Sequence, residues 1–135
     1  MLESIEIKGF RSFSQESIQK IKLQPFTVIV GENDTGKSNL LKAIAFVLDN
    51  DNSIIVKEDF NIRKSKSRTG KIVDKKAPQI SITVTFTESN KFLPTKFRKS
   101  KYRTTGKTTF SITCVASGKD KSTYKKEYKL NGINV

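Results

Sequence analysis

The stretch VIVGENDTGKSNLLKAI, residues 28–44, decides the fold of this 135-residue chain. A run of β-branched residues, 28–30, leads directly into GENDTGKS, residues 31–38, which matches the pattern G-x-x-x-x-G-K-[ST] without a mismatch. Apolar residues then recur at helical spacing, at Leu40, Leu41, Ile44, Val47 and Leu48. We therefore predict a strand over residues 26–31 that is buried on both faces, a phosphate-binding loop, and an amphipathic helix that ends near residues 49–52.

Each part of the loop has a physical role in holding a nucleotide. Gly31 and Gly36 allow backbone angles that a side chain would block. The amides of residues 34–38 and the positive end of the helix can then face the phosphate oxygens. Lys37 is expected to reach the β- and γ-phosphates, and the Ser38 hydroxyl to coordinate Mg²⁺. The sequence thus predicts ATP and Mg²⁺ as cofactors, with an ordinary glycine-rich turn as the alternative.

A nucleotide hydrolase usually has a further apolar strand that ends in Asp or Asp-Glu and positions Mg²⁺ and water. The nearest candidate is SIIVKED, residues 53–59, but Lys57 interrupts its apolar run. We interpret Glu58 and Asp59 as solvated loop acids. The chain also lacks histidine, which could contact a γ-phosphate. We therefore assign no catalytic residue and expect the chain to bind a nucleotide but to hydrolyse it poorly, so whether it is an enzyme by itself stays open.

Strands are predicted on both sides of this motif. Residues 2–8 alternate, with Ile5 and Ile7 on one face, and residues 16–23 form a weaker strand. Clear alternation returns over residues 79–88 and 108–117, and residues 122–135 read as a strand, a turn at Asn131-Gly132 and the start of another strand. We divide the single domain into a phosphate-loop core over 1–50, a basic loop region over 51–78 with an exposed loop over 64–78, and an antiparallel sheet over 79–135.

Composition limits the function classes further. Residues 1–60 carry seven Lys/Arg and nine Asp/Glu, whereas residues 61–135 carry 19 Lys/Arg and four Asp/Glu, a net charge of +15. This asymmetry fits either a polyanion-binding face or a solvated lysine-rich surface. The single cysteine, Cys114, and the absence of histidine argue against a zinc site, and we expect Cys114 to be buried in a strand. We see neither a signal peptide nor a membrane-spanning stretch, which favours a cytoplasmic protein without membrane contacts.

These residues carry a family resemblance. IEIKGFRSF, residues 5–13, followed by FTVIVGENDTGKSNLLKAI, residues 26–44, resembles the N-terminus of ABC-type ATPases related to SMC, RecF and the OLD nucleases. The later segments KEDFNI and ISITVTF are similar to the OLD branch in particular. The resemblance implies an α/β (α+β) fold, the N-terminal lobe of a P-loop ABC-ATPase head, with a mixed sheet, a P-loop helix and an antiparallel β-subdomain.

The resemblance also implies residue roles. Arg11 and Ser12 match an element that reaches the nucleotide phosphates, with a surface arginine between Phe10 and Phe13 as the alternative for Arg11. Asn33 matches the Asn of the family's G-x-N loop, or is a plain turn residue. The predicted cofactor-binding residues are Arg11, Ser12, Gly31, Asn33, Asp34, Thr35, Gly36, Lys37, Ser38 and Asn39, with Ser38 as the metal ligand.

Two functions from different classes are consistent with these observations. The first is the ATP-binding half of an ABC-type ATPase of a DNA-processing, repair or anti-phage defence protein. In such relatives two heads enclose ATP, so the implied partners are a second head in a homodimer, or the remaining C-terminal lobe, and DNA at the basic half. The alternative is a stand-alone basic nucleic-acid-binding module with a non-hydrolysing nucleotide site. A complete small kinase or GTPase fits poorly because no base-recognition motif is present. Nothing in these residues resembles the Toprim nuclease domain of OLD proteins.

Overall fold

The computed structural model describes residues 2–31, 36–48, 57–61, 65–66, 72–73, 78–87, 107–117 and 123–134. Within these ranges the regular elements are mostly strands, with one α-helix and one 3₁₀ turn. In chain order they are β1 Leu2–Lys8, β2 Gln19–Lys22, α1 Lys37–Leu48, η1 Lys57–Asp59, β3 Ser65–Lys66, β4 Ile72–Val73, β5 Gln79–Phe86, β6 Thr108–Ser117, β7 Thr123–Leu130 and β8 Ile133–Asn134.

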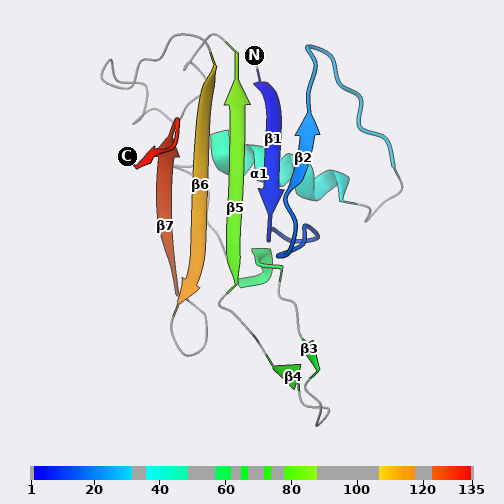
Figure 1. The fold of residues 1–135 in the computed structure, drawn as a ribbon. Helices are drawn as coiled ribbons and strands as arrows, with labels where there is room; N and C mark the ends of the chain where they lie inside the picture. The colour runs from blue at the N-terminus through cyan, green and yellow to red at the C-terminus, as the bar shows by residue number, and fades with distance from the viewer. Residues whose placement is uncertain are drawn as a thin grey trace.

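One antiparallel sheet dominates the molecule, with strand order β2-β1-β5-β6-β7-β8. β1 inserts between β2 and β5, pairing Ile5 with Ile21 on one side and with Val84 on the other. The strands predicted in the first and last thirds of the chain therefore belong to the same sheet. Helix α1 lies across one face of this sheet, behind it in Figure 1, and leaves the opposite face uncovered.

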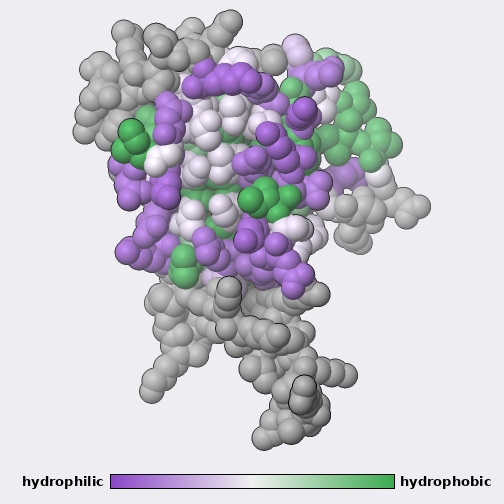
Figure 2. All heavy atoms as spheres, in the orientation of Figure 1, coloured by the Kyte–Doolittle hydropathy of each residue, from purple (hydrophilic) through white to green (hydrophobic). Residues whose placement is uncertain are grey.

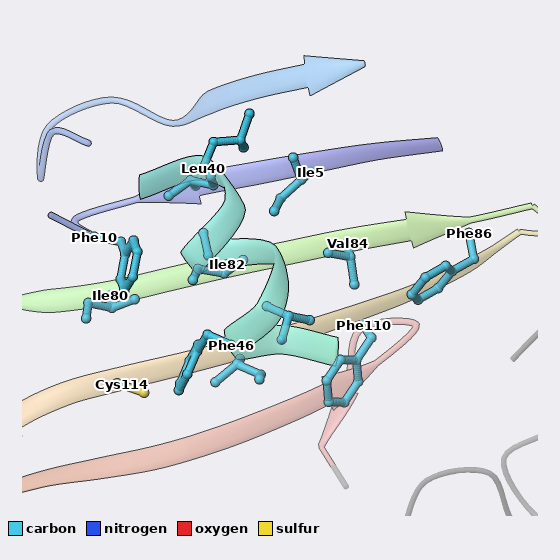
Figure 3. Packing of buried hydrophobic residues seen from close by; sticks show 14 of the residues in the cluster. Ile5, Phe10, Leu40, Phe46, Ile80, Ile82, Val84, Phe86, Phe110 and Cys114 are labelled. Carbon is cyan, nitrogen blue, oxygen red and sulfur yellow. The ribbon is translucent and has the colours of Figure 1, made fainter. Parts of the chain in front are cut away.

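The core fills the space between α1 and the sheet. Strands β1, β5 and β6 direct alternate side chains toward the helix because successive side chains of a strand point to opposite faces. The inward residues with no exposed surface include Ile7, Ile82, Val84, Phe86 and Phe110. From the helix, Leu40, Ala43, Phe46 and Val47 pack against them (Figure 3). Loss of a fully buried Phe side chain typically costs about 3–5 kcal/mol, so the packing between α1 and the sheet contributes strongly to stability.

Most of the predicted elements are confirmed. Strands 2–8, 79–88 and 108–117 appear as β1, β5 and β6, and Ile5 and Ile7 share the buried face of β1 as predicted. β2 lies within residues 16–23. The turn between β7 and β8 is at Asn131 and Gly132, which adopt φ of 50° and 81°, the left-handed pair that a two-residue hairpin needs. The fold class, an α/β lobe with a phosphate-loop helix on a β-sheet, is therefore confirmed.

The predicted central strand over residues 26–31 is wrong. This segment carries no strand pairing, and Phe26, Val28 and Val30 are 84%, 64% and 86% exposed. A β-branched run has strand propensity, but a strand also needs neighbours for its backbone groups and apolar cover on both faces. No described segment supplies either, so an apolar segment remains on the surface at the right of Figure 2, beyond β2.

The predicted apolar stripe of the helix is also wrong at one position. Leu41 is 58% exposed, whereas Ala43 and Phe46, outside the predicted stripe, are buried. The sheet covers the helix from one side only, and the stripe that faces it runs through Leu40, Ala43 and Val47 at i, i+3 and i+7.

The predicted exposed loop over residues 64–78 contains a short two-stranded ribbon. β3 and β4 pair Ser65 with Val73 and Lys66 with Ile72. Residues 62–64, 67–71 and 74–77, like 49–56 before them, lie outside the described residues. Among the residues that the structure does describe, no helix is long and apolar enough to cross a membrane.

Cys114 on β6 is buried, as predicted, and burial raises the pKa of its thiol from 9.0 to about 11, although the positive charge of Lys126 partly opposes this.

Because the pKa of Cys114 is raised, the folded chain retains a proton between pH 9 and 11 that the unfolded chain releases. We predict that the free energy of unfolding falls with rising pH across this window more steeply in the parent than in Cys114→Ala, measured by urea denaturation. At pH 8, a thiol reagent should modify Cys114 only as fast as the chain unfolds. An equal dependence of stability on pH in the parent and in Cys114→Ala, or rapid labelling of the folded chain, would contradict a buried Cys114 thiol with a raised pKa.

Candidate functional site

The start of α1 is set by Gly36 and Lys37. Gly36 has a φ of 99°, which side chains rarely tolerate, and its carbonyl accepts the first helical hydrogen bond from the Leu40 amide at 2.9 Å. The helix begins at Lys37, and its Nζ donates to the carbonyl of Gly31 on the other side of the loop. Lys37, which directly follows Gly36, thus links the two ends of the predicted phosphate loop through its contact with Gly31.

A second loop, residues 9–15 after β1, lies against this helix start. The Asn39 side chain, in the first turn of α1, donates from Nδ2 to the Ser12 hydroxyl at 3.0 Å. A Cβ placed on Gly36 would lie 3.4 Å from the same oxygen. The structure therefore brings Ser12 and Asn39, both predicted site residues, beside Gly36 and Lys37.

An open pocket of about 450 Å³ lies between these segments. Its lining combines the loop after β1, strand β2, the segment before the phosphate loop and the start of α1, and includes Ser12, Ile21, Ile29, Val30, Gly36 and Lys37. This volume falls in the range of small-molecule sites. The exposed segment that failed to form a strand is therefore one wall of the pocket.

Arg11 does not line this pocket. Its guanidinium lies 2.7 Å from a carboxylate oxygen of Asp59 and stacks near the Phe10 ring, 5.7 Å from the ring centroid. The interpretation of Asp59 as a solvated acid is wrong, since it is 5% exposed. Burial of a carboxylate is tolerated here because a buried charge can be compensated by a paired cation. Glu58 beside it is exposed, as predicted.

Three further residues that the sequence did not single out fix the loop after β1. The Gln15 side chain donates to the Asn61 carbonyl at 2.7 Å and accepts from the Gln79 amide at 3.3 Å, which links three segments. The Asn61 side chain donates to the Arg11 carbonyl at 2.7 Å. A Cβ on Gly9 would overlap the Gln79 carbonyl oxygen, so only glycine fits there. No local signal marks Gln15 or Asn61, because their partners lie far away in the chain.

Five further predicted site residues belong to the phosphate-loop motif, residues 31–38. Asn33, Asp34 and Thr35 lie outside the described residues, and Gly31 and Ser38 are exposed. No group of three or more potential metal-ligating side chains occurs in the described part of the chain. Mg²⁺ in nucleotide sites is commonly held by one or two protein oxygens and the phosphates themselves.

The donors present fit a nucleotide phosphate. They consist of the amides in the first turn of α1, the ammonium of Lys37 and the hydroxyl of Ser12, beside a backbone turn at Gly36 that favours glycine, with the hydroxyl of Ser38 one residue further along the helix. Of these residues, Ser38 is the one that the sequence motif predicts to hold Mg²⁺. When bound, the metal would neutralise phosphate charge, whereas this chain's own residues would bind and orient the phosphates.

The comparisons with known proteins agree with this geometry. The family model described as AAA ATPase domain matches residues 1–134. A solved structure from work on the ATP-driven dimerization and DNA-stimulated activation of SMC ATPases has a TM-score of 0.64 over 99% of this chain and 71% of its own. At 21% identity, this likeness shows the fold alone.

Curated relatives point the same way. Structural maintenance of chromosomes protein 2 of Dictyostelium discoideum is 31% identical over 98% of this chain and 10% of its own length. The chromosome partition protein Smc of Lactiplantibacillus plantarum is 38% identical over 69% of this chain and 8% of its own. The Old nuclease of Escherichia phage P2 is 46% identical over 36% of this chain and 8% of its own. The chain thus spans a tenth or less of the length of these relatives.

The family match covers nearly the whole chain and includes both loops that form the pocket. The SMC relatives and the SMC head fold agree with a glycine loop that opens a helix beneath an antiparallel sheet. The chain belongs to the AAA ATPase domain family.

Proposed function

We propose that this chain is the ATP-binding N-terminal lobe of an SMC-like, ABC-type ATPase head. The observation that carries the proposal is the convergence of Gly36, Lys37 and the Ser12–Asn39 hydrogen bond on one pocket at the start of α1. The ammonium of Lys37 binds the β- and γ-phosphates, and amides of the loop, including those of Asn33, Asp34 and Thr35, contact their oxygens. Ser38 holds Mg²⁺, and Arg11, which is paired with Asp59 in this structure, is the proposed phosphate-side residue of the loop after β1.

The proposed site has two sides, of which this chain supplies one. Its sequence has no apolar strand that ends in Asp-Glu and no second glycine-rich helix start. The exposed apolar segment around Phe26, Val28 and Val30 adjoins the pocket and suits a covering C-terminal lobe. A second head, in a homodimer, would close the site over ATP, in keeping with the ATP-driven dimerization named for the SMC ATPases. ATP hydrolysis then belongs to the assembled site, and the isolated chain should turn over slowly.

The biological setting we infer is DNA processing, repair or defence against phage. Support for the OLD branch comes from the 48 residues shared with the phage P2 Old nuclease. This similarity covers only 36% of this chain and 8% of the nuclease, so no nuclease activity is assigned to this chain. The SMC relatives fit the same ATP-binding lobe.

The nucleotide site is tested with Lys37→Ala. We predict micromolar-class Mg·ATP binding by the parent, measured by isothermal titration calorimetry, and at least about a tenfold loss in the variant, because a charge-assisted phosphate contact disappears. Lys42→Ala is the matched control, since Lys42 is an exposed lysine on the same helix. Binding by Lys37→Ala at the parent affinity would refute the site.

A second function, nucleic-acid binding, is favoured by the uncovered face of the sheet (Figure 2). Its middle rows carry hydroxyl side chains, with Thr83 paired in register to Ser111, 2.9 Å apart. Lysines border these rows on both sides: Lys8, Lys20 and Lys22 on β1 and β2, and Lys125 and Lys129 on β7. Two of them pair with acids on the same face, Glu6 and Glu127. Because this face has no aromatic side chain among its described residues, it would contact backbone phosphates and not stack on bases.

This second function predicts a steep dependence of duplex DNA affinity on salt, measured by fluorescence anisotropy from 50 to about 200 mM salt. Replacing both Lys125 and Lys129 by Gln should lower the slope of log K against log salt by about two, roughly one per phosphate contact. Lys42→Gln, on the helix behind the sheet, should leave the slope unchanged. A flat salt response of the parent would rule out this surface as a polyanion-binding face.

A further inference from the structure

Arg11 has an unusual backbone conformation one residue before the pocket. Its φ is 50°, in the left-handed region that non-glycine residues adopt only when their surroundings impose it. Gly9, two residues earlier, is also left-handed, at 74°. The loop after β1 therefore needs external contacts to hold its shape, and such strained positions concentrate at functional sites.

The short segment Asp59–Asn61 supplies the contacts at Arg11. The Arg11 amide donates to the Asp59 carbonyl at 2.7 Å, and the Arg11 carbonyl accepts from the Asn61 side chain at 2.7 Å. The Asn61 amide donates to the Gly9 carbonyl at 2.8 Å, and Phe10 forms a β-bridge with Phe60. Backbone and side chain of Arg11 are thus held by residues about 50 positions away in the chain.

The ion pair between Arg11 and Asp59 orients the Arg11 side chain, which the backbone hydrogen bonds of Arg11 cannot do. The Asp59 side chain is 7% exposed and the Arg11 side chain 32%, so water screens their attraction weakly. Arg11 Nε is buried and has no hydrogen-bond partner in the described part of the chain, so its orientation depends on the Asp59 contact. Removing the carboxylate charge would leave this guanidinium without its 2.7 Å anchor.

The consequence reaches the pocket through Ser12. Ser12 directly follows Arg11, its hydroxyl accepts from Asn39 in the first turn of α1, and it lines the pocket with Gly36 and Lys37. Any shift of Arg11 therefore moves Ser12 relative to the phosphate loop. Glu58, adjacent to Asp59 but exposed, has no such connection in the contacts described.

We infer that Asp59 is a positioning residue of the nucleotide site, which holds the Arg11 loop so that Ser12 stays against the start of α1. It does not touch the nucleotide and acts through Arg11. This inference rests on the proposed function of the chain as an ATP-binding lobe.

The test uses the 135-residue chain and compares Asp59→Asn with Glu58→Gln as the matched control. Mg·ATP affinity is measured by calorimetry at a temperature where circular dichroism shows each variant folded. We expect Asp59→Asn to weaken binding about tenfold, as loss of a supporting contact behind a ligand commonly does, and Glu58→Gln to bind like the parent. If Asp59→Asn fails to fold, Asp59→Glu keeps the charge and lengthens the arm, and should weaken binding in the same direction.

A double variant separates positioning from a general loss of stability. Because Asp59 acts through Arg11, the affinity loss in Arg11→Ala/Asp59→Ala should be no larger than in Arg11→Ala alone. A purely structural role would lower the melting temperature without changing affinity in the folded chain, which would overturn the inference. Tighter binding by Asp59→Asn would overturn it as well, since Asp59 would then withhold Arg11 from the phosphates.

Lys37→Ala distinguishes the two levels of the account. If it binds ATP like the parent, the proposed function fails, and this inference fails with it. If it loses binding while Asp59→Asn does not, the nucleotide site stands and only the inference is wrong.

Discussion

The structure depends on the burial of one sheet face beneath a single helix. β1, β5 and β6 each direct alternate apolar residues toward α1, and Leu40, Ala43 and Val47 of the helix pack against them. No other described helix covers this face, so the position of α1 along the strands is fixed by these contacts. Because the helix begins at Lys37, the same burial that stabilises the fold also sets the location of the phosphate loop.

The second constraint is the ordering of the loop after β1. This loop leaves a core strand, turns through two left-handed residues, and is held by the segment Asp59–Asn61 and by the Gln15 side chain. It then contacts α1 through Ser12 and Asn39. The proposed nucleotide site is therefore built on the core from both sides, since one wall begins where α1 starts and the other where β1 ends. Rigid elements of this kind suit a site that must hold phosphate groups in one geometry.

The sequence predicted those parts of the fold whose signals are local. Alternation over β5 and β6, the Asn131-Gly132 turn and the helix that follows the G-x-x-x-x-G-K-S pattern each depend on neighbouring residues, and these elements are present. The failures involve distant partners. Residues 26–31 have strand propensity but no described strand to pair with. Asp59 is predicted to be solvated because its partner, Arg11, lies far away in the sequence. The roles of Arg11, Asn33 and the rest of the phosphate loop toward a nucleotide stay predictions.

The central claim, that the start of α1 and the Ser12 loop bind nucleotide phosphates, is tested most directly by ¹H–¹⁵N NMR titration with Mg·ATP. The account predicts that the largest amide shifts occur at Gly36, Lys37, Ser38 and Ser12, and that outward residues of the sheet such as Thr83 and Ser111 barely move. Shifts confined to that outward face, with none at Gly36–Ser38, would contradict the account and favour a polyanion-binding surface in its place.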